Sequence, residues 1–423
     1  MSAQIASPSS LPELPPEIWL KIFQIATFIP FERDLPATTF ESGLFCSYDT
    51  YQISAFERVL PLRLSIVLVS RRFYQIGAEV LYTAFHANAR LNDCDPKLSL
   101  FSDLLVSRPE LGRFIRRLSL WWSDRDEENN YRIISRCPNV IIFSSFAPLL
   151  SDDVPSVPWW RGLPKTIRSF DADVRRVAIE DIQRILRTLP HLEMLHLWDL
   201  QRDPTPHPPI CLPALRILSA WVNEYSNDEP CFSLLSTMQL PRLTALVSNV
   251  GMFDVGLSFP LDVWRRLEYF KPSHETHSGL RSDYFHNLRH LSLTLSLASL
   301  EAYLVYFPFH QLECLTFQTS PTYMNGTDRW EPNAELAMDL PLNARAMPKL
   351  KLLQLIFAYT GIYKYYCDDL KSAEDKDRFI SYFESLTASF ERRGVLFAET
   401  NDREVCPGFQ PICDILDMCK QSF

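Results

Sequence analysis

The sequence is poor in glycine and has no excess of basic residues. Only 11 of its 423 residues are glycine, and its formal net charge is −9. Scarce glycine disfavours loops that cradle phosphate groups, and no GxSxG, Walker or GxGxxG motif occurs. An acidic chain lacks the electrostatic footprint of a protein that binds nucleic acid or anionic membranes. We therefore expect no enzyme, no nucleic-acid partner and no membrane partner.

The sequence also gives little support for a metal centre, a signal peptide or a membrane span. The ten cysteines form no CxxC pair, and no histidine lies near Cys406, Cys413 and Cys419, so we predict buried thiols rather than a metal site. The first ten residues contain no basic residue and no apolar core, unlike a signal peptide. The longest apolar run, 291–309, includes Glu301 and many hydroxyls, which indicates a strand and a helix. These features predict a cytoplasmic or nuclear protein without cofactors.

The strongest signal is an eight-residue segment that recurs ten times. Its first residue is always aliphatic, its fourth is Leu or Phe, and its sixth is mostly small or apolar. Successive segments start 21 to 28 residues apart, except the last, which follows after 38. The copies are IRRLSLWW (115–122), VIIFSSFA (140–147), IRSFDADV (167–174), LEMLHLWD (192–199), LRILSAWV (215–222), LTALVSNV (243–250), LEYFKPSH (267–274), LRHLSLTL (288–295), LECLTFQT (312–319) and LKLLQLIF (350–357). This is the LxxLxL pattern of leucine-rich repeats.

Each segment predicts a short strand whose fourth and sixth side chains point into a shared core. One strand cannot bury that face alone, so neighbouring repeats stack. Proline precedes several segments by two residues, which suits a turn into a strand: Pro138, Pro190, Pro213, Pro241 and Pro348. The connectors 177–189 and 297–307 have helical periodicity, and 377–391 predicts a last helix. The fold class is therefore α/β: an irregular solenoid with parallel strands on the concave side, and helices and loops on the convex side.

Strand alternation predicts that the third, fifth and seventh residues face solvent on the concave side. The seventh position is aromatic in four of the first five repeats, at Trp121, Phe146, Trp198 and Trp221. Polar candidates on the same side are Asp171, His196 and Arg117. One interpretation is a strip that binds a protein or peptide substrate. The other is that misaligned repeats or a loop cover these rings, and that Arg117 is a solvated charge.

The amino-terminal stretch LPPEIWLKIF (14–23) predicts a helix that starts with proline. Ile18, Ile22, Ile25 and Ile29 form one stripe, and Trp19, Phe23 and Ala26 form a second. Together the stripes are wider than one packing face requires. The excess predicts either a docking surface or a buried helix that caps the repeats.

At these residues the sequence resembles the F-box family. LPPEIWLKIF matches the opening pattern L-P-x-E-(I/L)-(L/W)-x-x-I-(L/F), and LVSRRFYQIG (68–77) with LY (81–82) matches the second half, with Ser70 for Cys and Phe73 for Trp. About thirty residues, 28–57, separate the halves as an inserted loop, which is inexpensive in loop-closure entropy. The resemblance implies a helical module at 11–85, after a disordered start at 1–10. A connector at 86–110, the repeats at 111–400 and a tail at 401–423 would follow.

The resemblance also implies a function. F-box modules bind a Skp-type adaptor, and through it a cullin scaffold, while attached repeats hold the substrate of an SCF-type ubiquitin ligase. The implied adaptor contacts are Leu14, Pro15, Ile18, Trp19, Ile22 and Phe23, while Leu68, Val69 and Phe73 share the contact or close the core of the module. We therefore expect a non-enzymatic substrate receptor. The alternative is a repeat scaffold without a ligase role.

Overall fold

The computed structural model describes residues 14–29, 35, 49–87, 96–121, 127–146, 162–174, 177–200, 207–222, 233–248, 259–272, 284–294, 309–319, 347–357, 372–400 and 409–421. These residues form two compact units, the first ending at Ile167 and the second beginning at Arg168. The first unit holds the amino-terminal helices together with the first two predicted repeat segments.

Three helices form the amino-terminal module: α1 (Pro16–Ala26), α3 (Asp49–Leu68) and α4 (Arg71–Leu81). Proline stands at the first position of α1, where its missing N–H is harmless. The Ser70 hydroxyl caps α4 by accepting the Phe73 N–H at 3.1 Å. Helix α1 therefore begins where the sequence pattern placed it.

Helix α3 differs from the expectation. It begins at Asp49, inside the segment 28–57 that was predicted as a loop, and it contains Pro61. Proline inside a helix removes a hydrogen bond and usually ends the helix, yet α3 continues through Pro61. The prediction of a loop throughout 28–57 is therefore wrong from Asp49 onward. Residues 30–34 and 36–48 lie outside the described part.

An aromatic core joins α1 and α4. Phe23 packs its ring against Trp19 and Phe73, with centroids 5.9 and 5.2 Å away, and Trp19 lies 4.9 Å from Phe73. At Gly77 an added Cβ would come within 2.9 Å of Val67 Cγ1, so glycine permits the close approach of α4 to α3.

Parallel strands dominate both units. In the first unit β1 (Ala84–His86), β2 (Arg117–Trp121) and β3 (Ile142–Phe146) pair in that order. In the second unit the order is β4 (Ser169–Asp173), β5 (Met194–Leu200), β7 (Ile217–Val222), β9 (Ala245–Ser248), β10 (Tyr269–Pro272), β11 (His290–Thr294), β12 (Cys314–Thr319), β13 (Leu352–Phe357), β14 (Leu396–Thr400) and the antiparallel β15 (Phe409–Pro411). A separate pair consists of β6 (Ile210–Cys211) and β8 (Met238–Gln239). The expected α/β class with parallel strands is confirmed.

The predicted segments occupy equivalent positions in the backbone. The N–H groups of Glu193 and Met194 both bond the Arg168 carbonyl, at 2.7 and 3.0 Å, and those of Arg216 and Ile217 bond the Glu193 carbonyl. The same pair of bonds recurs from β7 to β13 and between β2 and β3. The first and fourth residue of every segment are buried, as expected. The LxxLxL register assigned from the sequence is therefore the register of the sheet.

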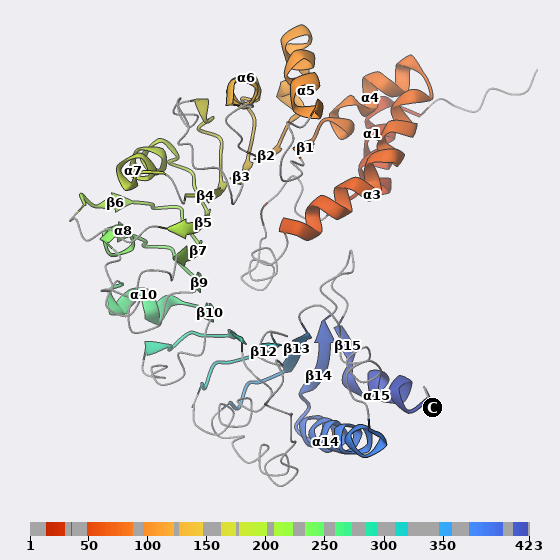
Figure 1. Ribbon diagram of the computed structural model, residues 1–423, viewed down its shortest axis with the longest axis vertical. Coiled ribbons are helices and arrows are strands. Elements are labelled where there is room, and N and C mark those ends of the chain that lie inside the picture. Colours follow the sequence, from red (N-terminus) through yellow and green to blue (C-terminus); the bar gives the residue numbers. More distant parts are fainter. Residues whose placement is uncertain are drawn as a thin grey trace, which may run out of the picture. The chain divides into compact units, whose positions relative to one another are not determined.

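Helices accompany the strands. Those of the first unit are α5 (Pro96–Ser107), the 3₁₀ helix η1 (Pro109–Phe114) and α6 (Glu127–Arg136), and those of the second are α7 (Ile179–Thr188), α8 (Ser233–Ser236), α10 (Leu261–Arg266), α14 (Ala373–Glu391) and α15 (Ile412–Gln421). Figure 1 shows α7, α8 and α10 together on one side of the strand row. Thus the helices expected at 177–189 and 377–391 are confirmed, whereas 297–307 lies outside the described residues. Among the helices described, none combines the length and apolarity of a membrane span.

Candidate interaction surfaces

Helix α1 turns its isoleucine stripe to solvent. Ile18 and Ile22 keep 44% and 40% of their surface exposed, and Ile25 is more exposed still. Phe23, from the aromatic stripe, is only 4% exposed, because it packs inside the module. The structure thus decides which residues are free. Ile18, Ile22 and Ile25 face outward, whereas Phe23 faces inward beside the half-buried Trp19. Ile29, the last residue of the isoleucine stripe, is buried.

Two further apolar residues, Leu68 and Val69, are exposed where α3 ends. They precede α4, whose Arg72 Nη2 donates to the Leu14 carbonyl at 3.4 Å and so ties the start of α4 to the start of α1. We name Leu14, Ile18, Ile22, Ile25, Leu68 and Val69 the apolar helical surface. Large apolar side chains gathered in solvent mark an interaction site more often than chance exposure.

The predicted adaptor contacts therefore divide into two groups. Leu14, Pro15, Ile18, Ile22, Leu68 and Val69 are exposed, while Trp19 and Phe73 are half-buried and Phe23 is buried. The second group forms the core that holds the first group in place. A direct contact through Phe23 would require this core to open.

The expectation that third and fifth strand positions face solvent is wrong for three candidates. Arg117, Asp171 and His196 are all less than 5% exposed. For Asp171 the physical reason is visible, because the Trp198 indole lies against it and Nε1 donates to Oδ1 at 2.7 Å. Arg117 lies between two paired strands, with Ala84 and Ile142 as its neighbours in register.

The rings of Trp198 and Trp221 form a stacked pair, with centroids 5.2 Å apart and planes 15° from parallel. Trp221 Nε1 donates to Ser219 Oγ at 3.1 Å, just as Trp198 donates to Asp171. The strand register shifts between Leu197 and Leu200, next to this pair, and such bulges re-aim side chains. Both indoles remain half-buried, whereas the side chains of Trp121 and Phe146 lie outside the described part.

Asp171, His196 and Ser219 stand side by side on β4, β5 and β7 in direct register. These are the residue types of a nucleophilic triad. However, Ser219 is only 1% exposed, and its oxygen already accepts the Trp221 indole N–H. A nucleophile must reach its substrate, so this buried polar row supports the indoles rather than chemistry.

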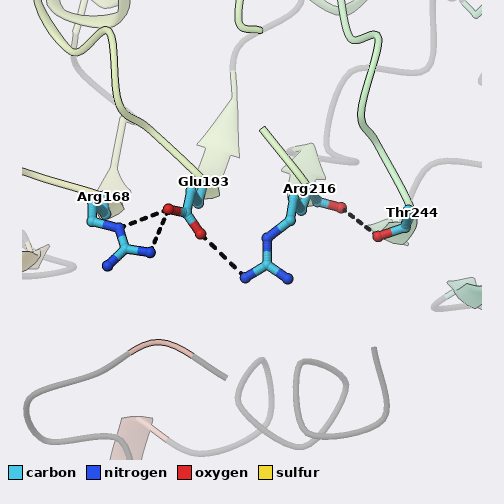
Figure 2. A network of polar contacts seen from close by, with 4 residues as sticks. All are labelled: Arg168, Glu193, Arg216 and Thr244. Atoms are coloured by element: carbon cyan, nitrogen blue, oxygen red, sulfur yellow. Dashed lines mark hydrogen bonds and ion pairs between the residues drawn. The ribbon is translucent and has the colours of Figure 1, made fainter. Parts of the chain in front are cut away.

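Charged side chains at the second position of successive segments form a row, which the sequence analysis did not predict. Figure 2 shows Glu193 between Arg168 and Arg216, with Oε1 2.7 Å from Arg168 Nε and Oε2 3.2 Å from Arg216 Nη2. Beside them the Thr244 hydroxyl donates to the Arg216 carbonyl. The signal was present, because the second letters of the segments read R, I, R, E, R, T, E, R, E, K.

A second triple repeats this arrangement. Glu313 accepts from Arg289 Nε at 2.7 Å and from Lys351 Nζ at 2.8 Å. The hydrogen bonds from Lys351 and Arg289, and the positive charges of both, hold the pKa of the Glu313 carboxyl below its usual value. In each triple the carboxylate is already bound by two cationic side chains, so it is not an open site for a cationic ligand.

The titratable groups of the described ranges include two buried thiols and a histidine with strongly shifted pKa values. Burial raises the pKa of the Cys137 and Cys314 thiols to about 12 and about 11, so neither is a reactive thiolate. Burial and the neighbouring Arg289 lower the pKa of His290 to about 4. Within the same residues no three His, Cys, Asp or Glu side chains gather in a way that could hold a metal ion.

Comparison with known proteins leaves the family open. No model of a known protein family matches the chain. No curated protein matches it either. A solved structure that is similar is a protein of Bacteroides fragilis determined by a structural genomics consortium, with a TM-score of 0.30 and 13% sequence identity over 65% of this chain and 69% of that chain. A TM-score this low supports no inference about this chain. The α/β class therefore rests on the strand pairing in this structure.

Proposed function

We propose that the chain is a substrate receptor of an SCF-type ubiquitin ligase. In this proposal the module α1, α3 and α4 is an F-box that binds a Skp-type adaptor, and through it a cullin scaffold. The parallel strands and their helices form a leucine-rich-repeat solenoid that binds a protein substrate. The receptor performs no chemistry, because holding a target beside the ubiquitin-loaded partner raises its effective concentration.

The observation that carries the proposal is the apolar helical surface. Its members are the exposed large apolar side chains within the two stretches that resemble an F-box, together with Ile25, which lies just beyond the first. Removing the exposed parts of Ile18 and Ile22 from water contributes roughly 1–2 kcal/mol for each side chain. A partner that covers all six residues thus gains binding energy that no packing within the module uses.

The test is binding of purified Skp-type adaptor to the full-length chain. Ile18→Asp together with Ile22→Asp should abolish binding while the protein stays folded, because both side chains already lie in water and an interface would bury the new charges unpaired. Leu261→Asp is the matched control, since Leu261 is equally exposed but lies on α10 in the second unit. Failure of the wild-type chain to bind any adaptor would leave a repeat scaffold without a ligase role as the remaining candidate.

A further inference from the structure

We propose that a basic row at the start of strands β9 to β13 binds an acidic segment of a protein, one that carries aspartate or glutamate side chains. This inference rests on the proposed function in one respect, namely that the repeats hold a protein target. It adds the chemical class of the segment that they recognise. The row consists of six residues that begin these strands or stand in the turns before them: Arg242, Arg265, Arg266, Arg289, Lys349 and Lys351.

The first support is the balance of charge along the row. Three acidic residues accompany the six basic ones: Asp262 on α10, which pairs with Arg266, and Glu268 and Glu313 at the second segment position. The described row therefore has an excess of three positive charges, although acidic residues outnumber basic ones by 51 to 42 in the whole chain. A local excess opposite in sign to the net charge of −9 favours an acidic ligand.

The second support is the exposure of three cations that no carboxylate neutralises. Arg242, Arg265 and Lys349 are exposed, and among the described residues none of the three forms an ion pair. Lys349 Nζ donates instead to Gln311 Oε1, which is a neutral acceptor. A ligand can therefore reach these charges without any rearrangement of the sheet.

The third support is that Glu313 holds two further cations in place without using all their donors. Arg289 Nε and Nη2 lie 2.7 and 2.6 Å from Glu313 Oε1, and Lys351 Nζ lies 2.8 Å from Oε2. A guanidinium has five N–H groups and an ammonium has three, so the Nη1 side of Arg289 and part of the Lys351 ammonium remain for a ligand. Their side chains are 50% and 73% exposed. Because both are already positioned, a carboxylate that joins them costs less side-chain entropy than one that must order two mobile cations.

The spacing of the charges favours a protein segment over a nucleic acid. Neighbouring strands lie roughly 4.8 Å apart, so the row from β9 to β13 spans about 19 Å, the length of about six extended residues. Glu268 and Glu313 interrupt the row, so a nucleic acid with a charge at every phosphate would meet two carboxylates. A peptide with separated carboxylates can place its charges beside the cations and its neutral residues beside the glutamates.

The experiment measures the fluorescence anisotropy of labelled probes added to the full-length chain. The probes are a peptide of alternating aspartate and serine, its counterpart with lysine in place of aspartate, and single-stranded oligothymidylate. We expect the aspartate peptide to bind saturably and to bind more weakly as sodium chloride is added. No binding of the aspartate peptide, or tighter binding of oligothymidylate, would overturn the proposal.

Two pairs of substitutions locate the binding. Arg289→Gln with Lys351→Gln should weaken binding of the aspartate peptide roughly two- to thirtyfold, because two charge contacts are lost, and should not weaken binding of the lysine peptide. The matched control, Arg132→Gln with Arg378→Gln, removes two exposed and ion-paired arginines from α6 and α14, and it should leave the affinity nearly unchanged.

Equal weakening by both pairs would assign the effect to net charge and contradict a specific row. Thermal unfolding checks that both variants remain folded. Adaptor binding is measured separately through the Ile18 and Ile22 substitutions, so the ligase assignment and the basic row fail or hold independently.

Discussion

Two single substitutions show how much each face of α1 contributes to the stability of the helix. Phe23 is buried between Trp19 and Phe73, so Phe23→Ala leaves a cavity in the aromatic contact between α1 and α4. Such a change costs about 3–5 kcal/mol. Ile22 keeps 40% of its surface in water, and alanine is the better helix former, so Ile22→Ala costs about 1 kcal/mol or less.

Hydrogen exchange followed by mass spectrometry measures this difference in stability directly on peptides that cover α1. The two variants should differ by at least about 2 kcal/mol, or roughly thirtyfold in the opening equilibrium of α1. Peptides that cover β5 in the second unit serve as the internal control and should exchange unchanged. Equal protection of α1 in both variants would refute the assignment of Phe23 to the inside and Ile22 to the outside.

Three further outcomes follow from the described contacts. Gly112→Ala should destabilise the first unit by about 1–3 kcal/mol, because its Cβ would lie 2.0 Å from the Arg136 carbonyl oxygen, and an unchanged melting temperature would contradict this. Glu313→Gln should cost under about 1 kcal/mol at neutral pH. The folded-state pKa of Glu313 is lowered, so its contribution to stability is present above the unfolded pKa and disappears as pH falls through the folded pKa. The difference in unfolding free energy between wild type and Glu313→Gln, measured by denaturant titration, should therefore be larger at neutral pH than at a pH below the folded pKa. Iodoacetamide should label exposed Cys211 in the native chain but spare Cys137, which peptide mass spectrometry checks.

Local pattern was sufficient for the repeat register. Hydrophobic residues at the first and fourth positions recur every 21 to 28 residues, or after 38 in the last case, and each lies in the core. Prolines such as Pro190 and Pro213 stand inside turns, since the N–H of Leu192 bonds the Leu189 carbonyl and that of Leu215 bonds the Leu212 carbonyl. Such features depend on neighbours in the chain, so sequence alone reveals them.

Exposure across the sheet could not be predicted in the same way. Alternation places Asp171, His196 and Trp198 on one face, but it does not say which side chain covers another. The indole of Trp198 spans two positions of the neighbouring strand and buries Asp171. The charged row was overlooked for a related reason: Glu193 matters only when Arg168 and Arg216, about 25 residues away on either side, lie beside it.

The sequence by itself determined the α/β class, the strand register and the site of an unusually apolar first helix, because each follows from residues close together in the chain. Only the tertiary structure decided that Ile18 and Ile22 face solvent while Phe23 faces Phe73. Both stripes of α1 are apolar enough to be buried. The physical difference is that aromatic rings from α1 and α4 fill the space between these helices, which leaves Ile18 and Ile22 in solvent.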